Sequence, residues 1–389
     1  MRLLHTSDWH LGRSFHREGM GPHQAAFIDH LVEVVVAEQV DVVLVAGDIY
    51  DRALPPVDAV KLADEAFARL AGAGARVVVT SGNHDSAIRL GAHSRLIDAA
   101  GVHLRTELDQ VGTPVLVGDE HGEVAVHGLP YLDPTSAQAA WDLPTRSHEA
   151  ALSEAMHRVR ADLSTRPTAR SVVLAHAFVA GAAPSDSERD ITVGGVSRVP
   201  VQVFEGIDYV ALGHLHGAHE LTPHLRYSGS PLAYSFSEAA HTKGSWLVDL
   251  GPDGLAGARF VPAPVPRPLG VLRGRLEDLL TQAAHAVWEQ AWLQVTLTDP
   301  VRPDRAMERL RVRFPHTLVL AFEPEGARPL GTPHAPAHLD SAHDVALEFV
   351  HEVRGAPATA AEEQLLREAV DACCADPDQD PRTGVVVAR

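Results

Sequence analysis

Five short apolar segments constrain the fold of this chain more than any other feature, because each is followed at once by residues that can bind metal ions. Each segment is rich in Val, Leu or Ile at consecutive positions, a pattern typical of strands buried on both faces. These segments are 2–6, 41–46, 76–80, 171–175 and 207–212. Helical patterns separate them, at 22–38, 56–71, 86–99 and 147–163. This alternation predicts an α/β fold.

The polar residues that follow the five segments are of the types that bind metals. In chain order they are Asp8, His10, Asp48, Asn83, His84, Asp85, His176, His214 and His216. Ligands of open α/β sheets bind in the crevice beyond the carboxyl ends of the strands, so we expect these side chains to meet in one crevice. Asp8 and His10 are two residues apart, as are His214 and His216, and in extended chain such pairs point to the same side.

The composition of this set favours a centre with two ions. Carboxylate, amide and imidazole groups together suit Mn, Fe or Zn, whereas an all-oxygen set suits Mg or Ca. Seven ligands are too many for one ion but suit two ions that share a bridging carboxylate. Three glycines precede ligands, at Gly47, Gly82 and Gly213, where the backbone must turn sharply and approach closely. Each motif alone is more often a turn or a helix cap, and only the full series indicates a metal centre.

Taken in order, these motifs resemble those of the calcineurin-like metallophosphoesterases, and most closely the SbcD nuclease subunits of bacterial SbcC–SbcD complexes. The stretches that carry the resemblance are SDWHLG (7–12), GDIYD (47–51), SGNHDS (81–86), HGLPY (127–131), GHLH (213–216) and YSGSP (227–231). They cover roughly residues 1–240, and the match beyond them rests on the order and length of the segments. The resemblance implies a four-layer α-β-β-α sandwich with a small βαβαβ cap domain and a C-terminal helical hairpin.

The resemblance also implies a role for each residue of the centre. One ion would be held by Asp8, His10, Asp48 and His216. The other would be held by Asp48, Asn83, His176 and His214, with Asp48 as the bridge. His84 would face the scissile phosphate as a catalytic residue. Asp85 would either orient His84 or cap a helix over 86–99. Some relatives outside bacteria have a second active-site histidine where this chain has Asp51, so the role of that histidine is not carried over.

The activity implied by the resemblance is a Mn²⁺-dependent DNA nuclease of repair and recombination, with two Mn²⁺ ions per chain. It would cut double-strand ends as an exonuclease, and single strands or hairpins as an endonuclease. Two ions would activate a water and neutralise the phosphate charge, while His84 protonates or stabilises the departing alkoxide.

Two other functions compete with this interpretation. A phosphoprotein or small-molecule phosphatase on the same core is the first alternative, since residues 47–52 resemble the corresponding phosphatase stretch and Arg52 could bind a phosphate. Pro55 and Pro56 after that stretch, and the cap and tail, argue against it. A non-catalytic scaffold for DNA ends is the second alternative, and the presence of all seven ligands argues against it.

Proline-rich stretches divide the chain. Alternating prolines, Pro262 to Pro268, suit neither a helix nor a central strand, and a second such stretch spans 324–336. We therefore predict a catalytic domain over 1–264, a DNA-binding cap over 269–322 and a C-terminal segment over 340–389. The candidate DNA contacts of the cap are Arg302, Arg305 and Arg309, and the alternative is a solvated helical face paired with Asp304 or Glu308.

The C-terminal segment is strongly acidic and predicts two amphipathic helices. Their apolar residues, among them Val345, Phe349, Val353 and Leu366, are spaced for docking in a groove of a partner. The resemblance makes that partner an SbcC-type ATPase, in a heterotetramer built on a homodimer through 56–71 and 86–99. The tract 324–336 would be the tether. The alternative is a hairpin packed on its own domain.

Composition limits which other classes of protein this chain can belong to. The net charge of −18 argues against a general nucleic-acid binder, although a basic patch or bound metal ions can reverse the sign at one face. No apolar run is long enough for a transmembrane helix, and the N-terminus has no signal-peptide pattern. Cys373 and Cys374 are adjacent and cannot form a disulfide framework, so we expect a cytoplasmic, nucleoid-associated protein.

Overall fold

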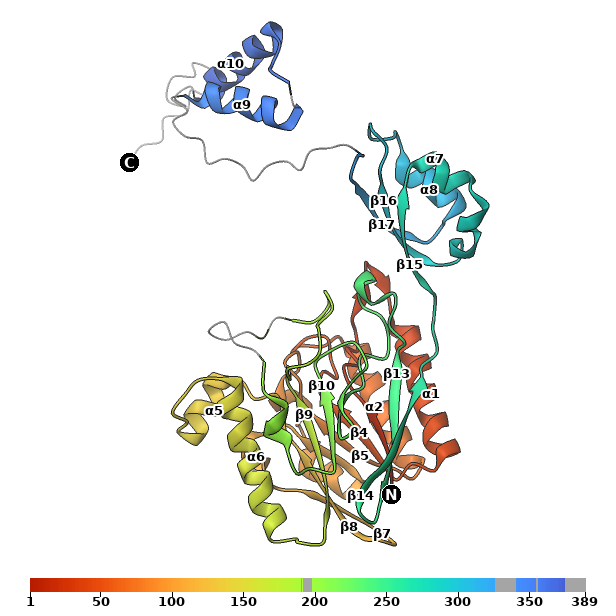
Figure 1. Ribbon diagram of the computed structural model, residues 1–389, viewed down its shortest axis with the longest axis vertical. Helices are drawn as coiled ribbons and strands as arrows, with labels where there is room; N and C mark the ends of the chain where they lie inside the picture. Colours follow the sequence, from red (N-terminus) through yellow and green to blue (C-terminus); the bar gives the residue numbers. More distant parts are fainter. Residues whose placement is uncertain (190, 192–197, 326–340, 355, 375–389) are drawn as a thin grey trace. The chain divides into compact units, whose positions relative to one another are not determined.

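The computed structural model describes residues 1–189, 191, 198–325, 341–354 and 356–374 (Figure 1). The chain forms two compact units. The first comprises Met1–Leu272, Leu279–Val295 and Met307–Leu320. The second comprises Arg273–Asp278, Thr296–Ala306 and the described part of Ala321–Arg389. The three-domain division expected from the sequence stays a prediction. Among the described residues, no helix combines the length and apolar character needed to cross a membrane.

Two six-stranded sheets form the first unit. One has the order β14-β13-β1-β4-β5-β6 and the other β11-β12-β10-β9-β8-β7. The strands of the first sheet are β1 (Arg2–Thr6), β4 (Val42–Ala46), β5 (Arg76–Thr80), β6 (Val102–Arg105), β13 (Gly244–Gly251) and β14 (Gly254–Pro262). Those of the second are β7 (Val115–Asp119), β8 (Gly122–Gly128), β9 (Arg170–His176), β10 (Tyr209–Gly213), β11 (His219–Thr222) and β12 (Leu225–Tyr227). The central strands of each sheet are parallel, so their carboxyl ends lie at one edge.

Helices cover the outer faces of both sheets. The main ones are α1 (Gly21–Glu38), α2 (Val57–Gly72), α5 (Pro134–Trp141) and α6 (His148–Ser164). On β4, Val43 packs in the core shared with α1 and α2, whereas Leu44 packs in the core between the two sheets. On β9, Val173 faces α6 and Leu174 faces the other sheet. Alternate residues of one strand thus fill two cores, which confirms the predicted α-β-β-α layers.

The cap segment has the predicted βαβαβ order. Its elements are β15 (Leu269–Gly274), α7 (Leu276–Thr281), the 3₁₀ helix η5 (Ala283–Trp288), β16 (Trp292–Leu297), α8 (Ala306–Arg313) and β17 (Thr317–Phe322). The three strands form one sheet in the order β15-β16-β17.

The C-terminal segment contains two paired helices, α9 (Ala342–Arg354) and α10 (Ala360–Cys374). The backbone N–H of Thr359 donates to Glu362 at 2.7 Å, and the N–H of Glu362 donates to the Thr359 hydroxyl at 3.4 Å. This reciprocal capping box starts α10. The predicted hairpin is therefore confirmed, whereas the predicted tether lies outside the described residues from 326 onward.

The predicted helix over 86–99 is wrong. The segment forms two short helices, α3 (Ala87–Leu90) and α4 (Ser94–Ile97), followed by the 3₁₀ turn η1 (Asp98–Ala100). His93, which precedes α4, has a left-handed φ of 64°, which no continuous α-helix accommodates. The remaining elements are short: β2 (Ser14–Phe15), β3 (Glu18–Gly19), η2 (Leu108–Gln110), η3 (Val201–Phe204) and η4 (Phe236–Glu238).

Candidate metal centre

The candidate ligands lie where β1, β4, β5, β9 and β10 end, so the first sheet contributes three loops and the second contributes two. The backbone N–H of His214 donates to both carboxylate oxygens of Asp8, at 3.1 Å each, and this contact joins the two sheets. The structure therefore brings the five sequence motifs to one place, although up to 206 residues separate the partners.

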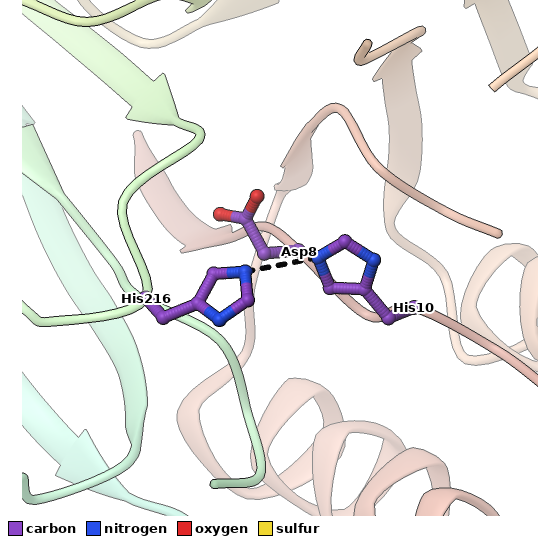
Figure 2. Close-up of side chains that lie close together, drawn as sticks. All are labelled: Asp8, His10 and His216. Carbon is purple, nitrogen blue, oxygen red and sulfur yellow. Dashed lines mark hydrogen bonds between the residues drawn. The ribbon is translucent and has the colours of Figure 1, made fainter. Parts of the chain in front are cut away.

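One group of candidate ligands comes from the loops after β1 and β10. Figure 2 shows Asp8, His10 and His216 turned toward one another, and one donor atom from each lies within 4.8 Å of the other two. The Nε2 atoms of His10 and His216 are 3.0 Å apart. Asp48 approaches this group, because its Oδ2 lies 3.8 Å from His10 Nε2. All four side chains are buried.

A second group lies on the other side of Asp48. His176 Nε2 is 3.5 Å from Asp48 Oδ2 and 2.9 Å from Asn83 Oδ1. Asn83 Oδ1 is also 3.2 Å from Nδ1 of His214. Asp48 thus contacts members of both groups, as a bridging ligand must. His84 Nε2 lies 4.0 Å from Asp48 Oδ2, so this histidine also belongs to the centre.

Four of these residues have unusual backbone conformations. Their φ angles are positive, at 54° for Asp8, 46° for His10, 52° for Asp48 and 107° for His214. Positive φ is uncommon outside glycine, and such strain concentrates at functional sites, where it costs about 1–3 kcal/mol per residue. The backbone is therefore bent at the ligands themselves, to aim their side chains inward.

The three glycines before the ligands have the predicted role. Gly47 has a φ of 85°. A Cβ atom at Gly82 would lie 2.1 Å from Asp48 Oδ1, and one at Gly213 would lie 1.8 Å from the carbonyl oxygen of Ala46. No side chain fits at either position without moving the loops that carry the centre.

Hydrogen bonds at Nδ1 fix the protonation of two imidazoles. His176 Nδ1–H donates to the carbonyl of Ala46 at 3.0 Å, and His84 Nδ1–H donates to the carbonyl of Asp51 at 2.7 Å. In the neutral ring the lone pair is then on Nε2, the atom that faces Asp48. Metal-bound histidines usually have their other ring nitrogen held in this way, and with the carboxylates and the Asn83 amide the arrangement fits divalent cations.

Burial and neighbouring charges shift the pKa values of four side chains of the centre. Burial raises the pKa of Asp8 to about 6 and lowers that of His214 to about 3. Burial opposes the charged forms of Asp48 and His176 too, but their mutual attraction is stronger. It holds the pKa of Asp48 well below its usual range and raises that of His176 to about 9. Divalent cations would compete with the His176 proton for Asp48.

Asp85 has neither of its two predicted roles. Its carboxylate accepts hydrogen bonds from the backbone N–H groups of Ile49, Tyr50 and Gly82, at 3.1, 2.9 and 2.9 Å. It therefore ties the loop after β4 to the loop after β5. Ser86 caps the short helix α3, since its hydroxyl accepts from Arg89 N–H at 3.4 Å.

Four residues of the centre were not predicted from the sequence. They surround His216 and are Ser187, Glu188, Glu238 and Lys243. None belongs to a motif with a metal-ligand spacing. The one available signal was rarity, because Lys243 is one of only two lysines in the chain.

The three candidate DNA-binding residues are exposed. Arg302, Arg305 and Arg309 project from α8 and the turn before it. The Arg305 Nε atom lies 3.6 Å from Asp304, and the guanidinium of Arg302 lies 5.9 Å from the centre of the Phe322 ring.

On α9, the apolar side chains Val345, Phe349 and Val353 are 47%, 63% and 59% exposed. Leu366 on α10 is half-buried. The hairpin therefore leaves much of its apolar surface uncovered within the described chain.

Comparison with protein families identifies the catalytic core. Residues 1–218 match the model of the calcineurin-like phosphoesterases. The chain belongs to the calcineurin-like phosphoesterase family. Residues 265–349 match a second model, SbcD_C, which is described as the type 5 capsule protein repressor C-terminal domain. The two domains in this order place the chain with the SbcD-type members, as the sequence motifs predicted. The family and the cluster of Asp and His side chains together indicate a metal-binding hydrolase of phosphoester bonds.

Three solved structures match this chain at low sequence identity. A dimetal phosphatase from Danio rerio is 14% identical, with a TM-score of 0.40 over 68% of this chain and 99% of its own. The protein TT1561 from Thermus thermophilus is 14% identical, with a TM-score of 0.39 over 67% and 98%. GAP50, the anchor in the inner membrane complex of Plasmodium, is 11% identical, with a TM-score of 0.37 over 85% and 99%.

Proposed function

We propose that this protein is a DNA nuclease that uses two Mn²⁺ ions and acts as the SbcD subunit of a complex with an SbcC-type ATPase. It would work at the nucleoid in the cytoplasm, in DNA repair and recombination, as a double-strand exonuclease and a single-strand or hairpin endonuclease. The observation that carries the proposal is the position of Asp48 between two groups of candidate ligands, in a chain that also carries an SbcD_C domain.

The residues divide between two ions at Asp48. Asp8, His10 and His216 would hold one ion together with Asp48, and Asn83, His176 and His214 would hold the other. When bound, such a pair supplies an activated water and neutralises charge on a phosphodiester. The chain itself supplies the orientation of these ligands and excludes bulk water from most of them, because all six Asp and His ligands are buried.

His84 is placed to act on the leaving group. Its Nδ1–H bond to the Asp51 carbonyl fixes the ring, so that Nε2 faces the centre. Burial lowers the pKa of His84, which leaves Nε2 without a proton at neutral pH. An anionic phosphodiester close to the ring would raise that pKa again and favour the imidazolium. His84 would then donate the Nε2 proton to the departing alkoxide.

A comparison of substrates tests the proposed activity. Linear duplex, hairpin and single-stranded DNA are incubated with the protein and Mn²⁺, beside a phosphopeptide. We expect cleavage of the DNA substrates, since the exposed arginines of the cap offer contacts to a phosphate backbone. Faster turnover of the phosphopeptide would instead support the alternative phosphatase, in which Arg52 binds the phosphate. In the structure Arg52 is largely exposed and lies 3.6 Å from Asp51.

The C-terminal helices are proposed to dock on the ATPase, at the base of its coiled coil. Their exposed apolar side chains at Val345, Phe349 and Val353 lie at i, i+4 and i+8, a spacing typical of helix-in-groove binding. The acidic tail has little reason to pack on a catalytic domain that is also acidic.

Removal of residues 340–389 should therefore separate binding from cleavage. We expect the truncated chain to cut short single strands at the rate of the full chain and to lose co-purification with the ATPase. Cleavage rates of the full-length and truncated chains measure activity, and their pull-down yields with the ATPase measure binding. Unchanged affinity for the ATPase, or an unfolded truncated chain, would refute the docking.

A homodimer is proposed through α2, α3 and α4. Several apolar side chains of these elements and of the loop before α2 are largely exposed, namely Leu54, Val57, Ile88 and Leu96. Their burial between two copies would remove an apolar surface from water. Two ATPase subunits on this dimer would complete a heterotetramer.

A further inference from the structure

One candidate ligand, His216, is held by side chains far more than the others. Its backbone N–H donates to Glu188 Oε1 at 2.7 Å, and its backbone carbonyl accepts from Lys243 Nζ at 2.8 Å. Its ring Nδ1 hydrogen-bonds to the Ser187 hydroxyl. His176, in the other group, has its Nδ1 fixed by the backbone carbonyl of Ala46 instead.

The contacts of His216 lead to a buried ion pair. The Ser187 hydroxyl donates to Glu238 Oε1 at 2.5 Å, and Glu238 Oε2 accepts from Lys243 Nζ at 2.5 Å. The side chains of Glu238 and Lys243 are 0% and 9% exposed. Lys243 also donates to Ser230 Oγ at 3.0 Å. Since charged side chains are rarely buried unless they are paired, this pair is a built feature of the fold.

The direction of the hydrogen bonds determines which His216 nitrogen is available. Because the Ser187 hydroxyl donates its proton to Glu238, its oxygen accepts from His216 Nδ1–H. The lone pair of His216 is then on Nε2, 3.0 Å from His10 Nε2, where the ion of that group would bind. The hydrogen bonds that link Lys243, Glu238 and Ser187 therefore set both the tautomer and the orientation of the His216 ring.

We infer that Glu238, Lys243 and Ser187 are positioning residues for the ion held by Asp8, His10, Asp48 and His216, and that they set its affinity separately from that of the other ion. This inference rests on the proposed two-ion centre. Residues that orient a metal ligand in this way typically change metal affinity about 10–100-fold. The two histidines that would hold the other ion, His176 and His214, hydrogen-bond instead to Ala46 and Asn83. The affinity for that ion should therefore change much less.

The test is a Mn²⁺ titration of full-length, metal-stripped protein by isothermal calorimetry. Glu238→Met/Lys243→Met removes both charges together and leaves side chains of similar length, which avoids an unpaired buried charge. We expect two binding events in the wild type, and in this variant one event about 10–100-fold weaker with the other nearly unchanged. Ser187→Ala, which leaves the ion pair intact, should weaken the same event to a smaller extent.

The control is an equally buried ion pair at the far end of β9. The side chains of Arg170 and Asp119 are 5% and 9% exposed. Asp119→Leu/Arg170→Met should lower the unfolding temperature and leave both Mn²⁺ affinities unchanged. The inference would be overturned if the control variant weakened Mn²⁺ binding as much as Glu238→Met/Lys243→Met does. It would also be overturned if neither Glu238→Met/Lys243→Met nor Ser187→Ala changed a Mn²⁺ affinity. A wild type that binds no Mn²⁺ would instead overturn the two-ion proposal on which the inference rests.

Discussion

Asp48→Asn should abolish cleavage and leave fewer than two ions per chain. The Asp48 carboxylate contacts both groups of ligands, at 3.8 Å from His10 and 3.5 Å from His176. An amide of the same shape carries no charge, so it would weaken the binding of both ions. It would also leave His176 without its buried counter-charge. The loss of cleavage should therefore exceed the loss caused by substitution of any residue that would hold only one ion. Metal content by elemental analysis and single-turnover cleavage rates measure both effects.

The matched control for Asp48 is Asn83→Ala. Asn83 contacts His176 and His214, so its removal should weaken binding of the ion that this group would hold. Full occupancy and activity in Asp48→Asn would show that Asp48 does not bridge two ions.

His84→Ala should keep both ions and lose cleavage by about 10²–10⁴-fold, the range of general acid catalysis. The side chain of His84 is anchored by the Asp51 carbonyl, and its Nε2 is 4.0 Å from Asp48. Removal of the ring would leave the seven proposed ligands in place. Single-turnover rates at saturating Mn²⁺, together with metal content, separate a catalytic role from a ligand role.

The control for His84 is His127→Ala. His127 is also buried, but its Nε2 pairs with Asp162 at 3.1 Å. Its removal should lower stability and leave the rate of the folded protein unchanged. If His84→Ala loses metal, then His84 is a ligand and the assignment fails.

The layered core could be predicted because its strands carry apolar residues at consecutive positions. Val42 to Ala46 are all fully buried, and such strands leave little choice other than the middle of a layered protein. The metal centre could be predicted because each ligand directly follows one of these strands, so local spacing was enough. The strand β7 was not predicted from the sequence, because it lacks a run of consecutive buried apolar residues. It lies at a sheet edge with exposed Leu116 and Gly118, and its pattern is weak.

Long-range contacts set the limit of sequence reasoning. Ser187 and Lys243 bond to His216 across 29 and 27 residues, and Ser187 bonds to Glu238 across 51 residues. No periodicity links these positions. The break of the predicted helix over 86–99 depends on the positive φ of His93, which its residue type does not reveal. Asp85 looked like a helix cap because helix caps and loop clamps both use a carboxylate to accept backbone N–H bonds.

The proposed function requires that seven side chains hold two ions with Asp48 between them. Anomalous scattering at the manganese edge, from crystals of the full chain grown with Mn²⁺, tests it most directly. We expect one peak on each side of Asp48, one contacting Asp8, His10 and His216 and the other contacting Asn83, His176 and His214. A single peak, or peaks that do not contact Asp48, would contradict it.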